Sequence, residues 1–187
     1  SPFSAKLSVL LGDEQAEFYN MLNKEVTLEA ALEDQPIKII NGIVTGRRIS
    51  DDDEGNILLD FTISPWFKLL DIHKRYRIFQ NKSVIEIVKT VCRQSRLTMA
   101  SIDFQQLTLN YPKVDYCVQY QETDFTFVSR ILAQAGVYYV FEHALDKHTM
   151  VLKDNSLVAN KAANAFLYRD KSDTQPHIYN SSESFEC

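Results

Sequence analysis

The segment EHALDKH contains the side chains of this sequence that come nearest to a metal site. It holds Glu142, His143, Asp146 and His148. Imidazole and carboxylate groups are ordinary ligands of transition metals. The spacing matches no established metal-binding motif, however, and a polar turn between two strands explains the same residues. We therefore predict a surface turn here rather than a metal site.

A cysteine with a distant histidine as its base could act as a nucleophile. The candidates for a hydrolase or transferase site are Cys117 and Cys92, or the pair His143 and His148. Cys117 falls in an alternating strand and Cys92 extends the apolar face of a helix, so we predict that both are small core residues. The third cysteine, Cys187, suggests no role. Because the three cysteines are odd in number and far apart, we expect reduced thiols, as in a cytosolic protein.

Tyrosines provide a third candidate chemistry, the stacking of sugars or bases. Tyr116 and Tyr120 lie in one predicted strand, and Tyr138 and Tyr139 lie in another. Lysine and arginine side chains that would follow a nucleic-acid backbone are not concentrated beside them. We favour an aromatic core and a protein–protein interface, where tyrosine is common. A carbohydrate-binding surface remains the alternative.

The acidic run Asp51–Glu54 resembles half of a calcium loop. It lacks the alternating acids and the downstream glutamate of such a loop, so we predict a solvated hairpin loop with Gly55-Asn56 as its turn. Glycine-rich phosphate loops and the motifs H-E-x-x-H and G-x-S-x-G do not occur. We predict no catalytic, cofactor-binding or metal-binding residue and no enzymatic activity.

The composition is that of a globular chain able to bury a core. The 187 residues are 45% hydrophobic, which supports a core without disulfides or metal. A net charge of −5 and a pI of about 5.4 argue against nucleic acid or anionic membranes as partners. No apolar stretch approaches the length of a membrane span, and no signal peptide is visible at Ser1. The first residues have the pattern of a strand interior, so we expect a piece of a longer protein.

Hydrophobic periodicity predicts antiparallel strands in the first third of the chain. The strands are expected at Lys6–Leu11, Glu25–Leu32, Ile37–Thr45 and Ile57–Ser64. A short helical or turn segment is expected at Glu17–Leu22. Gly42, inside the third strand, indicates a bulge or a close approach of two backbones.

Two helices are predicted from their capping residues. Ser83 and Glu86 form a capping box, and the residues from Pro65 onward are expected to lead into that helix. The second helix is expected to begin at Thr123 or Asp124 and to stop at Gly136. Further strands are predicted at 116–121, 137–143 and 148–154, with a weakly extended segment at 98–115. The pattern predicts an α+β fold, mainly antiparallel β and barrel-like.

Three stretches, in order, form a recognisable set: INGIVT (Ile40–Thr45), PWFKLLDIHKRYRIFQNKSVIEIVKTV (Pro65–Val91) and YCVQYQETDFTFVSRILAQAGVYYVFEH (Tyr116–His143), with HTMVLKD following the third. Together they resemble the N-terminal region of VgrG, the spike protein family of type VI secretion systems. The resemblance covers most of residues 40–155.

This resemblance implies a fold like the hub of a contractile phage tail, with β-barrel tube domains and an inserted α/β part. It places a portion of the first barrel at 1–64, the α/β part at 65–155, and return strands or the start of a second barrel at 156–187. It carries over no catalytic residue.

The implied function is structural. The family assembles as a homotrimer that docks on the hexameric tube protein Hcp, and its later regions carry a PAAR tip protein and effectors. The implied location is the bacterial cytoplasm, followed by injection without a signal peptide. A tail hub of a contractile phage is a close alternative.

Overall fold

The computed structural model describes residues 2–11, 16–30, 38–51, 56–95, 101–155, 166–168 and 177–179. The chain divides into two compact units, Ser1–Asp154 and Asn155–Cys187. In the second unit, the described residues after Asn155 form one antiparallel pair of strands, β10 (Phe166–Tyr168) and β11 (His177–Tyr179).

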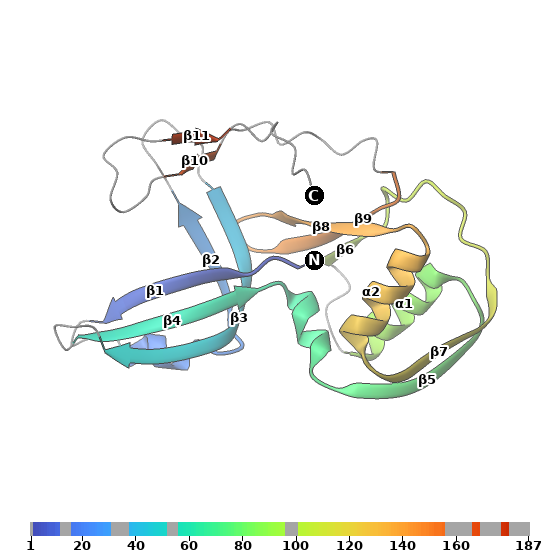
Figure 1. The fold of residues 1–187 in the computed structure, drawn as a ribbon, viewed down its shortest axis with the longest axis horizontal. Coiled ribbons are helices and arrows are strands. Elements are labelled where there is room, and N and C mark those ends of the chain that lie inside the picture. Colours follow the sequence, from blue (N-terminus) through green and yellow to red (C-terminus); the bar gives the residue numbers. More distant parts are fainter. Residues whose placement is uncertain are drawn as a thin grey trace. The chain divides into compact units, whose positions relative to one another are not determined.

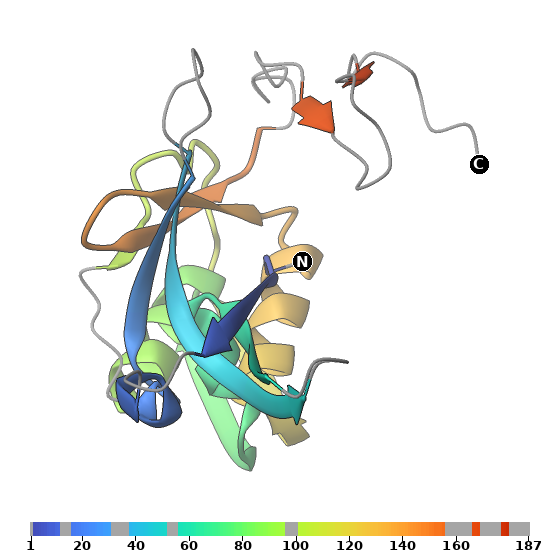
Figure 2. The same ribbon diagram turned by 90° about the vertical axis from the view of Figure 1, so that its left-hand side faces the viewer.

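A four-stranded antiparallel sheet occupies the N-terminal part of the first unit (Figures 1 and 2). Its spatial order is β1-β4-β3-β2, and the short helix η1 (Ala16–Asn20) lies between β1 and β2 in sequence. The strands are β1 (Ala5–Leu11), β2 (Glu25–Ala30), β3 (Lys38–Asp51) and β4 (Ile57–Ser64). Leu59, Phe61 and Ile63 alternate along β4 and are buried, as the sequence pattern predicts. All four predicted strands are confirmed, although β3 continues past Thr45 to Asp51.

Gly42 marks a close approach of β3 to β4, as predicted. A Cβ atom at this position would lie 2.6 Å from Ile63 Cγ2 and 3.0 Å from the Ser64 carbonyl oxygen. The bulge in this strand pair lies two residues further on, between Val44 and Gly46. The bulge places one extra residue of β3, Thr45, opposite β4 and so shifts the register of the pair.

The rest of the first unit has three layers (Figure 1). Helices α1 (Val84–Gln94) and α2 (Asp124–Gln134) lie between a two-stranded ribbon and a three-stranded sheet. The ribbon pairs β5 (Lys74–Lys82) with β7 (Val114–Thr123). The sheet has the order β6-β9-β8, with strands β6 (Ile102–Asp103), β8 (Tyr138–His143) and β9 (His148–Lys153). A single hydrophobic cluster joins both helices to β5, β9 and the short helix η2 (Trp66–Asp71).

The capping residues define both helices as predicted. The Ser83 hydroxyl accepts a hydrogen bond from the Glu86 amide at 3.3 Å, and the Glu86 carboxylate accepts from the Ser83 amide at 2.7 Å. The Thr123 hydroxyl caps α2 by accepting from the Thr126 amide at 3.2 Å. Gly136 follows α2 with a φ of 71°, the left-handed conformation that ends many helices.

The sequence predicted neither a helix nor a strand for residues 65–82, which precede α1 as expected. These residues do not simply lead into a helix; they form η2 and then the nine-residue strand β5. Periodicity fails here because Tyr76 and Ile78 face solvent while Arg77 faces the helices. An inward arginine reverses the usual alternation of buried apolar and exposed polar residues.

The fold is mostly antiparallel β with few helices, as expected, and β6 pairs in parallel with β9. In the described part of the first unit, β1 and β2 are the edges of an open sheet. The proposed boundary at residues 64 and 65 stays a prediction. Among the described residues, none of the helices has the length and apolar character needed to span a bilayer.

Candidate interaction surface

The outer face of the β5–β7 ribbon exposes large apolar side chains. Tyr76, Ile78, Tyr116 and Tyr120 are 63%, 60%, 57% and 68% exposed, and we call these four residues the aromatic face. Tyr76 lies opposite Tyr120 in the register, and their rings meet edge-on with centroids 5.4 Å apart. Exposed apolar groups gathered in this way are typical of a protein-binding surface.

The inner face of the same ribbon packs on the helices. Phe79 of β5 stacks on Phe127 of α2, with ring centroids 5.6 Å apart and planes only 11° from parallel. Gln119 of β7 is fully buried, and Cys117 is partly buried against the core. Because side chains alternate across a strand, this packing fixes Tyr116 and Tyr120 on the solvent side.

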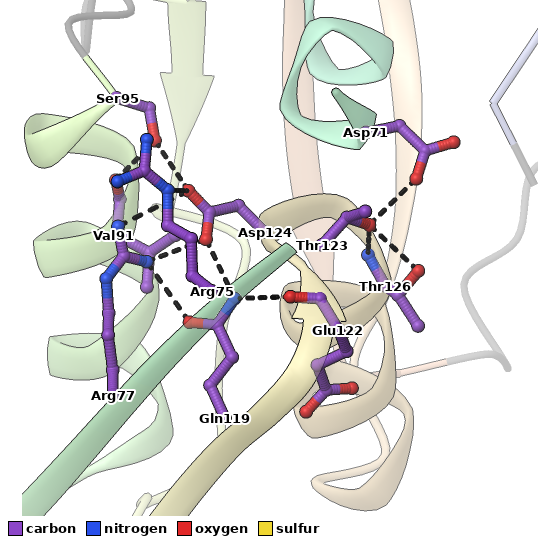
Figure 3. A network of polar contacts seen from close by, with 10 residues as sticks. All are labelled: Asp71, Arg75, Arg77, Val91, Ser95, Gln119, Glu122, Thr123, Asp124 and Thr126. Carbon is purple, nitrogen blue, oxygen red and sulfur yellow. Dashed lines mark hydrogen bonds and ion pairs between the residues drawn. The ribbon is translucent and has the colours of Figure 1, made fainter. Parts of the chain in front are cut away.

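A buried carboxylate, Asp124, holds the ribbon to both helices (Figure 3). Arg77 donates to its Oδ1 at 2.7 Å, and Arg75 Nε lies 3.3 Å from its Oδ2. Gln119 Nε2 donates to Oδ1 at 2.8 Å, and the Ser95 hydroxyl, at the end of α1, donates to Oδ2 at 3.1 Å. Asp124 is also the first residue of α2, where a negative charge is favourable.

The sequence identified Asp124 only as a possible helix start. It did not indicate the partners Arg77 and Gln119, which come from separate strands. The one available signal was Arg75-x-Arg77, two arginines at alternate positions in a segment otherwise fit for a strand. We call Asp124 and its partners Arg75, Arg77, Gln119 and Ser95 the Asp124 cluster; it joins β5, β7 and the end of α1 to the first residue of α2.

His143 and His148 are brought together, but not with the acids of their turn. Their ring centroids are 6.1 Å apart, and each ring accepts a backbone N–H, His143 from Asn41 and His148 from Trp66. Glu142 is exposed, as is Asp146. Among the described residues, no group of three or more His, Cys, Asp or Glu side chains could hold a metal ion.

The cysteines lie apart from this histidine pair. Cys92 is buried on α1, and burial raises the pKa of its thiol to about 12. Burial also raises the pKa of the Cys117 thiol on β7, where Arg130 and Glu122 are the charged neighbours. A raised pKa removes the thiolate that a nucleophile needs. Both cysteines sit in the core or pack against it, as predicted, and Cys187 lies outside the described residues.

The four tyrosines singled out in the sequence do not form one surface. Tyr139 packs into the core against Phe67, with centroids 5.3 Å apart, and Tyr138 is its neighbour on the other side of β8. Of these four tyrosines, Tyr116 and Tyr120 belong to the aromatic face, and Tyr138 and Tyr139 do not. The ring of Tyr120 stands at 86° to that of Tyr76, so these two rings do not form the coplanar pair that a sugar platform needs.

A hollow of about 740 Å³ lies between the four-stranded sheet and the helical part. Its walls include Phe3, Thr62, Leu69 and Phe125, and its charged residues, Lys68 and Asp71, pair with each other at 2.6 Å. Neither the cysteines nor the histidine pair line it. Of the acidic run, Asp51 ends β3, and residues 52–54 lie outside the described residues.

Comparison with known proteins confirms the resemblance found in the sequence. Residues 1–186 match the phage tail baseplate hub (GPD) family. The type VI secretion system spike protein VgrG1b of Pseudomonas aeruginosa is 34% identical over 154 residues, which are 82% of this chain and 20% of that protein. VgrG1a of the same organism is 46% identical over 94 residues, which are 50% of this chain and 14% of that protein.

A solved structure shares the fold. The Escherichia coli c3393 protein is described as a type VI secretion component similar in structure to the T4 bacteriophage tail proteins gp27 and gp5. It aligns with a TM-score of 0.74 and 22% identity, over 84% of this chain and 43% of that chain. The chain spans a fifth or less of the length of the two curated relatives. By its family match and by its identity to these spike proteins, the chain belongs to the phage tail baseplate hub family.

Proposed function

We propose that this chain is the hub part of a type VI secretion spike and that its work is structural. The observation that carries the proposal is the 34% identity to the spike protein VgrG1b across 82% of the chain. Both cysteines pack in or against the core on α1 and β7, and both histidines accept backbone N–H groups on the β8–β9 hairpin, which supports a role without catalysis. A hydrolase that uses these groups would need them in one pocket.

The aromatic face is the proposed assembly contact. Its four side chains lie on the outer face of the β5–β7 ribbon. Phe79 and the Asp124 cluster hold the inner face of that ribbon against the helices. A rigid support lowers the conformational entropy lost when a partner binds. Tyrosine at the centre of such a surface contributes much of the binding energy in many interfaces.

The proposed partners are those that the family resemblance implies. In the full spike, three copies form a homotrimer, the trimer docks on the Hcp ring, and regions beyond this chain carry the PAAR tip and effectors. Neighbouring subunits of the trimer would complete the closure of the four-stranded sheet into a tube-domain barrel. The protein would assemble in the bacterial cytoplasm and leave with the secreted tube.

The test uses the complete protein that carries this chain. We expect a molar mass of three subunits in light scattering and co-sedimentation with purified Hcp rings. Replacing Tyr76 and Tyr120 by serine should weaken one of these two contacts by at least tenfold, and which one weakens identifies the partner of the aromatic face.

Leu145→Ser is the matched control, because Leu145 is 62% exposed on the turn of the β8–β9 hairpin, outside the ribbon. Its trimer mass and ring binding should equal those of the unchanged protein. A protein that is monomeric in light scattering and does not co-sediment with Hcp rings would refute the proposal. The alternative, a contractile phage tail hub, predicts a trimer that binds a phage tube protein in place of Hcp.

A further inference from the structure

Two histidines of the β8–β9 hairpin each accept a backbone N–H from another part of the first unit. The Trp66 N–H donates to His148 Nε2 at 2.9 Å, and the Asn41 N–H donates to His143 Nδ1 at 3.2 Å. Each bond needs the lone pair of a neutral imidazole. We propose that this histidine pair is an acid-sensitive latch, which holds the hairpin to β3 and η2 at neutral pH and releases it in acid.

The remaining bonds of the junction fix which nitrogen carries the proton. Because His148 Nε2 accepts from Trp66, the neutral ring keeps its proton on Nδ1, which donates to Asn41 Oδ1 at 2.8 Å. Asn41 Nδ2 donates to the Thr27 hydroxyl at 2.9 Å, and this hydroxyl donates to the Leu145 carbonyl at 2.7 Å. The chain of bonds runs from η2 through the hairpin to β3 and β2.

Protonation would break both backbone bonds in the same way. A proton on His148 Nε2 would face the Trp66 N–H, and a proton on His143 Nδ1 would face the Asn41 N–H, so that donor meets donor. His148 is only 4% exposed, so the displaced N–H of Trp66 would have little water to replace its partner. Two charged rings with centroids 6.1 Å apart would also repel each other.

The surroundings of the pair favour the neutral state. Phe3 packs edge-on against both rings, with centroids 4.9 Å from His143 and 6.0 Å from His148. Burial lowers the pKa of His148 to about 4, with His143 as a second cause, and burial also lowers the pKa of His143.

Charged groups on the elements that pack against the histidine pair do not offset this lowering of the two pKa values. Glu142, Asp146 and Lys147 of the hairpin are exposed, and on η2 Lys68 pairs with Asp71. On β2 and β3 the charged side chains are likewise exposed: Glu25, Glu29, Lys38, Arg47, Arg48 and Asp51.

The sign of the pH effect follows from the lowered pKa. A histidine whose folded-state pKa lies below its unfolded value of 6.5 binds its proton more readily once the latch is open. The stabilisation that the neutral His148 contributes to the closed latch is therefore fully present above pH 6.5 and is lost as the pH falls toward 4. For His148 alone, the equilibrium constant for opening the latch (open over closed) rises about tenfold for each unit by which the pH falls within this window.

This inference does not depend on the hub function. Acid release would loosen the four-stranded sheet from the layered part at one junction while the two helices, held by the Asp124 cluster and their caps, stay folded. The chain contains its own reporter, because Trp66 is the single tryptophan and its backbone amide is one of the two donors.

The test is an acid titration of the full chain from pH 7.5 to 4, followed by tryptophan emission, far-ultraviolet circular dichroism and the imidazole NMR signals. We expect the Trp66 emission to shift to longer wavelength as His148 titrates, while the helical dichroism persists. Unchanged emission down to pH 4 would overturn the latch. Loss of the helical signal in the same transition would overturn it as well, because the event would then be global unfolding.

Two variants complete the experiment. His148→Gln should remove the acid transition of Trp66, whereas His73→Gln, at an exposed histidine before β5, should leave it unchanged. The same transition in His148→Gln would contradict the assignment. If His148→Gln does not fold, the NMR titration of His148 in the unchanged chain decides: protonation with the emission shift supports the latch, and protonation without it overturns the latch.

Discussion

At the scale of single residues, Asp124 is the position on which the supported ribbon most depends. It is 3% exposed and faces two arginines, of which Arg77 has a side chain only 14% exposed. Asp124→Ala would leave the nearly buried charge of Arg77 without its carboxylate partner, with the Gln119 amide oxygen still accepting from it at 3.1 Å. We expect the free energy of unfolding at pH 7 to fall by about 3–5 kcal/mol, measured by urea denaturation.

Asp115→Asn is the control for this change, since Asp115 is an exposed acid of the same ribbon. Its effect on the free energy of unfolding should stay within about 0.5 kcal/mol. A loss below about 1 kcal/mol for Asp124→Ala would show that the cluster does not hold the ribbon to the helices.

A second residue-scale prediction concerns Gly42. An added methyl group would meet Ile63 Cγ2 at 2.6 Å and the Ser64 backbone at 3.0 Å, so β3 and β4 would have to separate. We expect Gly42→Ala to lower the free energy of unfolding by about 1–3 kcal/mol in the same assay. Gly46→Ala meets only the Thr62 side chain at 3.3 Å and should cost less. Equal costs at both glycines would contradict this explanation.

At the scale of elements, the start of α1 rests on a reciprocal cap. Ser83→Ala removes the acceptor of the Glu86 amide and should lower the free energy of unfolding by about 1 kcal/mol, measured by thermal or urea denaturation. Ser83→Asp keeps an acceptor at the same place and should recover most of this loss. If the two variants are equally unstable, the cap is not what stabilises the helix.

The loop between β6 and β7 is tied down by one carboxylate at the end of β9. Asp154 accepts from the amides of Thr108 and Leu109, each at 2.7 Å, and from the Tyr111 hydroxyl at 2.8 Å. These donors hold the pKa of Asp154 at about 2. In Asp154→Ala, amide hydrogen exchange at Thr108 and Leu109 should speed up while the α2 amides stay protected. Unchanged exchange at both loop amides would contradict the clamp.

The same elements show what could be read from the sequence. Both helices were predicted because their signals are local: Ser83 with Glu86, Thr123 or Asp124 at the start of the second helix, and Gly136 after its last turn. Strand β5 was missed because its inward residue is Arg77, which is explained only by an acid 47 positions away. The exposure of Tyr116 and Tyr120 follows from alternation, but Tyr76 joined them only when the pairing of β5 with β7 was known.

At the scale of the whole molecule, the chain combines an open four-stranded sheet with a layered part that presents the aromatic face. The contact between these two parts includes the junction of His143, His148 and Asn41. No local pattern predicted it, since Asn41 and His148 are 107 residues apart in sequence. The sequence therefore identified the family and most elements, while the contacts that support the proposed surface and latch depend on tertiary pairing.

The measurement that tests the central claim most directly is secretion of the Hcp tube protein by the bacterium that encodes this chain. The strain should lack other spike genes and carry a deletion of the gene containing this one. If the chain is part of a type VI spike hub, Hcp will accumulate in the cells and disappear from the medium, and the intact gene will restore its release. Unchanged Hcp in the medium of the deletion strain would contradict the account.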